Sequence, residues 1–286
     1  MKINSKIQIK KGNLILFCGA IFVFVWLLII NLIKGPQWIM GSDLGYTYLL
    51  NGLNILLGIE IGVLIHPAIT VSYFYATIIY FYHSFFGTGE LQSHVISNAE
   101  LYSIVLNTLT YLGISFGCFF LGSCVYKITK KISYSLLVIL SILAIPVRVL
   151  PNAANAGPES LLLIFIPIIA GICFLKANNS CTQKLFVFVS AIVCAMSIGT
   201  KFISIPVIIL PLLVSKGFKE KQEFILVFLI SLSIVFMPIF LSLQQLKLFI
   251  INMIGLTGSI SLERNSFQSE SPIFQAILFL FQTLKE

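Results

Sequence analysis

Charged side chains are scarce in this chain of 286 residues, in which Asp, Glu, Lys and Arg together make up 10%. A soluble globular domain carries about a quarter of its residues as charged side chains. Hydrophobic residues reach 58% here, and several apolar runs approach the roughly 20 residues needed to cross a bilayer. The composition therefore excludes an ordinary soluble domain and predicts an all-α, polytopic integral membrane protein with the bilayer as its partner.

Motifs for nucleotide, metal and acyl-transfer chemistry are also missing. The chain has no Gly-rich phosphate loop, no C-x-x-C pair, no His/Cys/Asp spacing typical of a metal site and no nucleophile elbow. Five of the six cysteines lie within apolar runs, which indicates small packing residues rather than disulfides. No cofactor follows from the sequence, and a divalent metal is left open but not indicated.

The formal net charge of +8 does not gather in one basic patch. The lysines stand between the hydrophobic runs, as the positive-inside bias of membrane loops predicts, so nucleic acid is not an expected partner. Four of them precede the apolar run at residues 14–33, which is too long for a signal-peptide core and lacks a small-residue cleavage site. Residues 13–34 are therefore predicted to be an uncleaved first span with a cytoplasmic N-terminus.

The rest of the sequence predicts one membrane domain over residues 1–286, without internal repeats. The expected segments are an external loop at 35–67, a helix at 68–86, a helix bundle at 101–245, an external loop at 246–272 and an incomplete last helix at 273–286. Within the bundle the expected spans are 101–126, 133–149, 161–175 and 224–243, with two short apolar pieces, 185–199 and 202–214, joined at Thr200-Lys201. Because the last apolar piece is too short to cross, we expect an N-terminal portion or a short member of its family.

The lysine clusters decide the role of residues 68–86. If every apolar run crossed, the cluster at residues 127–131 would lie outside, against the charge bias. A re-entrant or juxtamembrane helix at 68–86 instead places all later lysine clusters in the cytoplasm. Most acids then fall in outward-facing loops, so we expect a chemical site on the outer face of a plasma or inner membrane.

Residues 43–58 predict an amphipathic helix in that outer interface. Its apolar side consists of Tyr46, Leu49, Leu50, Leu53, Leu56 and Leu57, and its polar side consists of Asp43, Thr47, Asn51, Asn54 and Gly58. We expect the apolar side to face lipid and the polar side to face water, where it would form one wall of an active site.

Lys201 joins two short apolar pieces, and a cation in such a position is costly unless it reaches water or an anion. The piece at residues 185–199 is about 22 Å long as a helix, shorter than the roughly 30 Å hydrocarbon core. The tip of this hairpin should therefore be recessed to the depth of a lipid phosphate. The ammonium either binds that phosphate or snorkels to the interface.

Several features occur in a particular order along the chain. An acid follows the first span, an amphipathic helix comes next, and His66-Pro67 opens an aromatic-rich helix. Glu159 later begins a span in NAGPESLLL, and SIGTKFISIPVIILP carries Lys201 in a hairpin. Over about residues 13–245 this order resembles the GT-C glycosyltransferases, among them the protein O-mannosyltransferases and the aminoarabinose transferases of lipid A.

The resemblance implies a GT-C-like helix bundle that transfers a sugar, with inversion, from a polyprenyl-phosphate donor to a lipid, glycan or protein acceptor. Asp43 would be the general base for the acceptor hydroxyl, or alternatively the N-cap of the following helix. His66 would orient the acceptor or the donor phosphate, or cap a helix. Arg148 would share the donor phosphate with Lys201. Glu159 would hold a sugar hydroxyl, or pair with Arg148 or Lys201.

Two other functions stay open at this point. A transporter or flippase of lipid-linked saccharides should show an internal repeat and ionisable groups near the bilayer midplane. A non-catalytic protein that binds the lipid carrier would fit the single acid at Asp43, where many GT-C enzymes carry two acids close together.

Overall fold

Helices are the only regular secondary structure in the part of the chain that the structure describes, residues 2–35, 44–62, 68–144 and 156–240 of a computed structural model. The chain separates into two units, residues 1–238 and 239–286, and all that follows concerns the first. Its elements are α1 (Lys2–Lys34), α2 (Leu44–Leu56), α3 (Ile69–Phe86), α4 (Leu91–Ser97), α5 (Ala99–Thr129), α6 (Ile132–Leu140), η2 (Ser141–Ala144), α8 (Pro158–Ala177), α9 (Gln183–Thr200), η3 (Phe202–Ile208), α10 (Ile209–Val214) and α11 (Phe218–Phe240).

Five of the described helices are long and apolar enough to cross a membrane. They comprise residues Lys11–Ile33, Ala99–Thr129, Pro158–Ala177, Gln183–Thr200 and Phe218–Phe240. The expected span at 133–149 is a shorter apolar helix in the structure, Ile132–Ala144, and the expected short piece at 202–214 is likewise a short apolar helix, Phe202–Val214. The described residues thus form an all-helical bundle that suits a multi-pass membrane protein, as the composition predicts.

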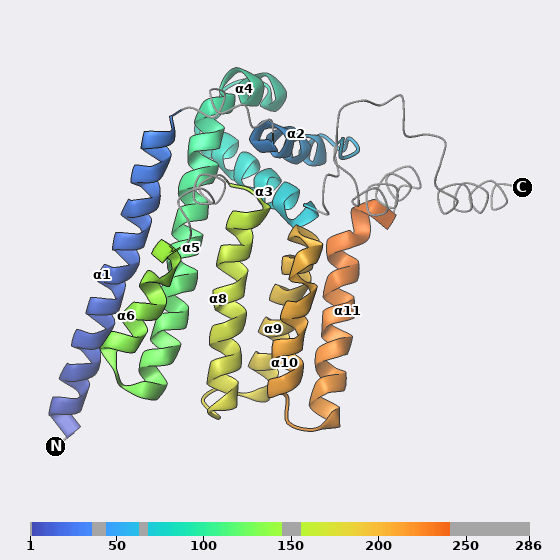
Figure 1. Ribbon diagram of the computed structural model, residues 1–286. Helices are drawn as coiled ribbons and strands as arrows, with labels where there is room; N and C mark the ends of the chain where they lie inside the picture. The colour runs from blue at the N-terminus through green and yellow to red at the C-terminus, as the bar shows by residue number, and fades with distance from the viewer. Residues whose placement is uncertain (1, 36–43, 63–67, 145–155, 241–286) are drawn as a thin grey trace, which may run out of the picture. The chain divides into compact units, whose positions relative to one another are not determined.

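The long helices run alongside one another, whereas α2, α3 and α4 gather at one end of the bundle (Figure 1). Helix α3 runs obliquely across that end and is not among the five helices suited to crossing. Its N-terminal half is buried, and Phe85 and Phe86 near its C-terminus are exposed. The assignment of residues 68–86 as a re-entrant or juxtamembrane helix stays a prediction.

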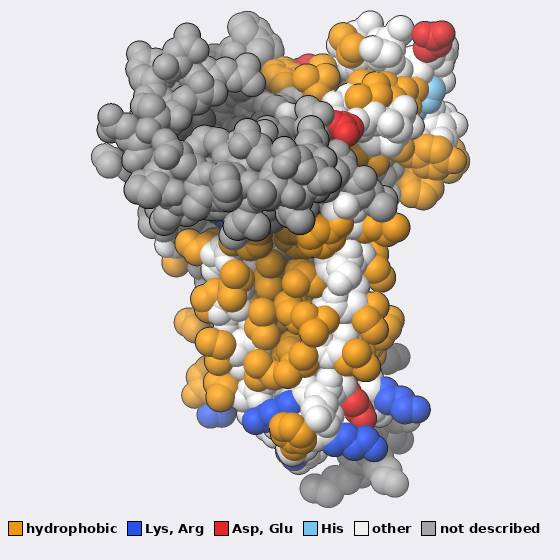
Figure 2. Space-filling view, turned by 90° about the vertical axis from the view of Figure 1, so that its right-hand side faces the viewer, with side chains coloured by type: hydrophobic (Ala, Val, Ile, Leu, Met, Phe, Trp, Pro, Cys, Tyr) orange, Lys and Arg blue, Asp and Glu red, His pale blue; other side chains and the backbone are white. Residues whose placement is uncertain are grey.

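Charges separate toward opposite ends of this unit. Basic side chains gather around the lower end in Figure 2, and most of the visible acidic side chains lie at the upper end with a histidine. The lower end holds the turns α5–α6, α8–α9 and α10–α11, which carry the lysine clusters (Figure 1). Glu159 and Lys201 instead lie at the end where α8 begins and α9 stops. The positive-inside bias predicts that the lysine-rich end is cytoplasmic.

Helix α2 corrects the predicted division between a lipid-facing side and a water-facing side. Asn51, assigned to water, is only 2% exposed, whereas Leu50, assigned to lipid, is 49% exposed. The reason is tertiary packing at the neighbouring Gly52, where a Cβ would lie 2.8 Å from the backbone nitrogen of Ala76 in α3. The polar stripe of α2 is therefore partly buried in the protein.

Helices α5 and α8 approach closely at Gly113 and Gly117, which form a G-x-x-x-G pair on α5. A Cβ at Gly117 would lie 3.0 Å from the backbone oxygen of Ile164, and one at Gly113 would meet only the end of the Ile164 side chain, at 2.6 Å. Small residues at such spacing let two helix backbones pack directly inside a membrane.

We expect the replacement Gly117→Ala to lower the free energy of unfolding by about 1–2 kcal/mol, because the backbone of α8 must move away to accommodate the added Cβ. Gly113→Ala is the matched control. Its loss of unfolding free energy should be smaller, because the flexible end of the Ile164 side chain can rotate away from the added Cβ. Denaturation of the purified protein by SDS in detergent micelles measures both. Equal losses would contradict a backbone contact at Gly117.

Candidate functional site

Glu159 and Lys201 form an ion pair at the end of the bundle opposite the lysine clusters. The Lys201 Nζ lies 2.5 Å from Glu159 Oε1. The Glu159 side chain is 43% exposed and the Lys201 side chain 25% exposed, so the pair sits at the edge of the protein rather than in its core. The sequence left three partners open for Glu159, namely a sugar hydroxyl, Arg148 or Lys201. The structure confirms the pairing with Lys201.

The local sequence explains where each partner is placed. Glu159 lies in the first turn of α8, directly after Pro158, where the positive end of the helix dipole favours a carboxylate. Lys201 has extended backbone angles, φ −160° and ψ 128°, between the end of α9 and the start of η3. Its carbonyl accepts hydrogen bonds from the backbone N–H and the hydroxyl of Ser204. The turn at Lys201 between two apolar helical segments is therefore confirmed. The first of them, α9, has 18 residues and is longer than the predicted piece at 185–199, and the recessed depth of the tip stays a prediction.

The start of α3 is bound to this hairpin. The backbone N–H of Ala68 donates to the carbonyl of Thr200 at 3.3 Å, and the Thr70 hydroxyl donates to the carbonyl of Met196 at 2.9 Å. Gly199 permits this approach, because a Cβ there would lie 2.6 Å from Thr70 Oγ1. The chain that follows His66-Pro67 is thus held one residue away from Lys201.

Two polar residues that the sequence interpretation missed anchor the segment leading to Glu159. The Tyr75 hydroxyl donates to the carbonyl of Ala156 at 2.5 Å. The side-chain oxygen of Asn107 accepts a hydrogen bond from the backbone N–H of Ala156 at 2.7 Å. Asn107 is 3% exposed, and a buried amide in a predicted span is the signal that could have identified it.

Tyr48 of α2 adds a hydroxyl without a hydrogen-bond partner among the described residues. Its side chain is 1% exposed, and its ring centroid lies 6.1 Å from that of Tyr75. Burial raises the pKa of Tyr48, and the nearby charge of Glu159 raises that pKa further. The Tyr48 hydroxyl therefore stays protonated, within electrostatic reach of the Glu159 carboxylate.

An apolar cavity of about 370 Å³ lies among α3, α8, α9 and α11. Its lining includes Leu161, two residues after Glu159, and Met196, five residues before Lys201. The complete lining is Thr70, Tyr73, Phe74, Thr77, Leu161, Ile164, Phe165, Met196 and Val235. A cavity of this composition can accommodate hydrocarbon, and the elements that form it also carry the ion pair.

Three predicted site residues, Asp43, His66 and Arg148, lie outside the described residues. Glu159 and Lys201 are the two that the structure brings together. Among the described residues, no three His, Cys, Asp or Glu side chains are grouped so that they could hold a metal ion.

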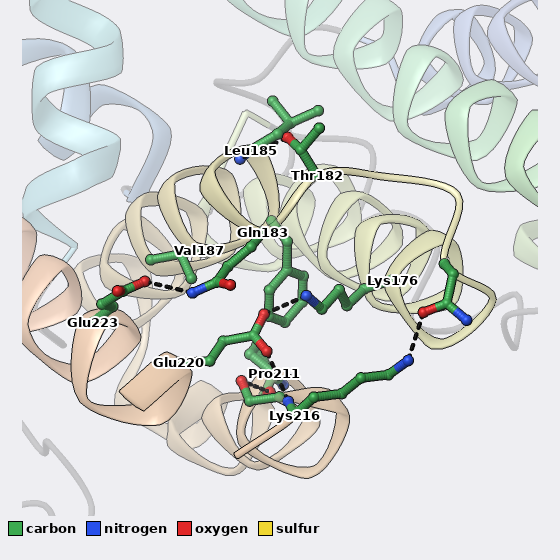
Figure 3. A network of polar contacts seen from close by, with 12 residues as sticks. Lys176, Thr182, Gln183, Leu185, Val187, Pro211, Lys216, Glu220 and Glu223 are labelled. Carbon is green, nitrogen blue, oxygen red and sulfur yellow. Dashed lines mark hydrogen bonds and ion pairs between the residues drawn. The ribbon is translucent and has the colours of Figure 1, made fainter. Parts of the chain in front are cut away.

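A second polar network ties the turns at the lysine-rich end together (Figure 3). Lys176, at the end of α8, forms an ion pair with Glu220 in the first turn of α11. The other carboxylate oxygen of Glu220 accepts the backbone N–H of Lys216 at 2.7 Å. The Lys176 and Glu220 side chains are 10% and 3% exposed, so this pair is enclosed by protein and has a structural role.

No protein-family model, curated protein or solved structure matches the chain.

Proposed function

We propose that this protein is a membrane glycosyltransferase of the GT-C type that uses a polyprenyl-phosphate sugar as donor. The observation that carries the proposal is the Glu159–Lys201 pair, positioned by α8 and the end of α9, two helices that also line an apolar cavity of about 370 Å³. A lipid-linked sugar phosphate has the three matching parts, namely a hydrocarbon chain, an anion and a hydroxylated ring. The acceptor is a lipid, glycan or protein on the outer face.

Each part of such a donor has a suitable partner. The hydrocarbon occupies the apolar cavity, and the Lys201 ammonium neutralises the phosphate. Lys201 can exchange its present carboxylate partner for the phosphate because both partners of the ion pair are partly exposed to solvent. Arg148 shares the phosphate, and His66 orients the phosphate or the acceptor.

The proposed reaction is a single displacement. The carboxylate of Asp43 takes the proton of the acceptor hydroxyl, whose oxygen then forms a bond to the anomeric carbon. The bond between that carbon and the phosphate oxygen breaks, and the polyprenyl phosphate leaves with the electron pair. Charge develops on the phosphate oxygen, where the Lys201 ammonium stabilises it. Inversion at the anomeric carbon follows from the single step.

We expect membranes containing the protein to transfer radiolabelled sugar from polyprenyl phosphate, and Asp43→Asn to lower this transfer by about 100-fold, because the amide cannot accept the proton. Single-turnover transfer at saturating donor measures the effect. Asp43→Glu, which keeps a carboxylate, is the matched control and should retain more activity.

Full transfer by the Asp43→Asn variant would remove Asp43 as the general base. Binding of the donor by the wild type without transfer to any acceptor class would instead indicate a non-catalytic carrier-binding protein. ATP- or ion-driven movement of the intact donor across vesicle membranes would indicate a flippase.

A further inference from the structure

Two buried tyrosines beside the site use their hydroxyls differently. Tyr48 and Tyr75 are both 1% exposed, and their rings lie 6.1 Å apart. The Tyr75 hydroxyl donates to the carbonyl of Ala156, whereas the Tyr48 hydroxyl has no partner among the described residues. Burying a hydroxyl without a hydrogen bond is costly. Such a group is retained most readily when a ligand completes its hydrogen bond.

The position of Tyr48 indicates what kind of ligand group this is. Tyr48 belongs to the same buried cluster as Ala156 and Leu161, on either side of Glu159, and the Glu159 charge acts on its hydroxyl. A carboxylate only accepts hydrogen bonds, and a protonated tyrosine can donate one. A ligand group that bridges the two residues must therefore donate a hydrogen bond to Glu159 and accept one from Tyr48.

A sugar hydroxyl can both donate and accept a hydrogen bond, whereas a phosphate oxyanion can only accept one. The negative charge of Glu159 would also repel a phosphate placed between it and Tyr48. Lys201, which pairs with Glu159, is the cation that suits the phosphate. The site therefore separates two kinds of recognition, with Lys201 for the anion and the Tyr48–Glu159 couple for a hydroxyl.

We propose that Tyr48 is a specificity-determining residue that donates a hydrogen bond to a hydroxyl of the donor sugar, while Glu159 accepts a hydrogen bond from that same hydroxyl. This inference rests on the proposed lipid-phosphate donor at Lys201. It adds a sugar contact from α2 to a site otherwise formed by α8 and the hairpin after α9. It also accounts for a buried hydroxyl that has no hydrogen-bond partner among the described residues.

The first test compares the stability of two matched variants without ligand. Tyr75→Phe removes a hydroxyl that donates to a carbonyl, so its melting temperature in detergent should fall by several degrees. Tyr48→Phe removes an unpaired hydroxyl, so its melting temperature should equal or exceed that of the wild type. A fall in Tyr48→Phe as large as that in Tyr75→Phe would show that the hydroxyl already has a partner in the protein, and would overturn the inference.

The second test measures affinity of the full chain in nanodiscs for farnesyl phosphate and for a panel of farnesyl phosphates carrying glucose, galactose, mannose, N-acetylglucosamine or arabinose. At least one glycosyl form should bind the wild type more tightly than farnesyl phosphate does. Tyr48→Phe should weaken binding of that form about tenfold and leave farnesyl phosphate unchanged, a difference that a purely structural role would not produce.

The outcomes separate this inference from the proposed function. Failure of farnesyl phosphate to bind in a Lys201-dependent way would count against the proposed function itself. Lys201-dependent binding of farnesyl phosphate, with no gain from any sugar or with equal losses in Tyr48→Phe for both ligands, would leave the lipid-phosphate site intact and overturn the role of Tyr48.

Discussion

Replacing Lys201 with alanine is expected to lower sugar transfer by roughly 100- to 1,000-fold, the effect of removing one group that stabilises developing negative charge. The Lys201 ammonium is held at the tip of the hairpin between α9 and η3, paired with Glu159. Without it, the leaving phosphate loses a cation and the Glu159 carboxylate loses its ion pair with Lys201. Transfer of radiolabelled sugar at saturating donor, with the amount of folded protein measured in the same membranes, gives the result.

Two matched variants make this prediction specific. Lys201→Arg keeps the positive charge and should retain more transfer than Lys201→Ala, although the planar guanidinium does not reproduce a point charge. Lys184→Ala removes a lysine from the second residue of α9, at the opposite end of the same helix, and should leave transfer unchanged. Equal activities of Lys201→Ala and Lys184→Ala would remove Lys201 from the proposed mechanism.

Replacing Glu220 with alanine is expected to lower the free energy of unfolding by about 3–5 kcal/mol, because it leaves a buried charge without its counter-ion. The Lys176 side chain is 10% exposed and the Glu220 side chain is 3% exposed. Each also lies at the helix end that suits its charge, Lys176 in the last turn of α8 and Glu220 in the first turn of α11. Denaturation by SDS in detergent micelles measures the loss.

The double variant Lys176→Met/Glu220→Leu provides the control. It removes both charges and keeps apolar volume, so it should be much more stable than Glu220→Ala, within about 1 kcal/mol of the wild type. Gln183→Ala tests a neighbouring contact in the same network, the 2.7 Å hydrogen bond to Glu223, which is exposed and should matter little. A double variant as unstable as Glu220→Ala would contradict the role of the unpaired buried charge.

The sequence was sufficient to predict the helical, multi-pass class because that class depends on composition and on the length of apolar runs. Hydrocarbon offers no hydrogen bonds, so a backbone in it must form helices or closed barrels, and long apolar runs favour helices. The lysine clusters likewise lie between the apolar runs and gather at one end of the bundle. The turn at Lys201 was also predictable, because a cation is costly inside an apolar span and therefore marks a break between two apolar segments.

The sequence did not predict correctly which residues of α2 are buried and which are exposed. Periodicity identifies which residues share a side of a helix, but it does not show what covers that side. Gly52 lets α3 pack against α2, and Asn51 becomes buried while Leu50 stays half exposed. The exposure of each side of α2 therefore depends on its packing against α3, a contact that periodicity does not predict.

For the candidate site, the sequence by itself selected Glu159 and Lys201, because ionisable residues are rare in an apolar chain and stand out at the ends of its spans. Only the tertiary structure decided that they pair across 42 residues of sequence, and that Tyr48 is buried near them with an unpaired hydroxyl. Helical periodicity and hydropathy are local properties. Which carboxylate a cation meets, and which hydroxyl is left without a partner, depend on how distant helices pack together.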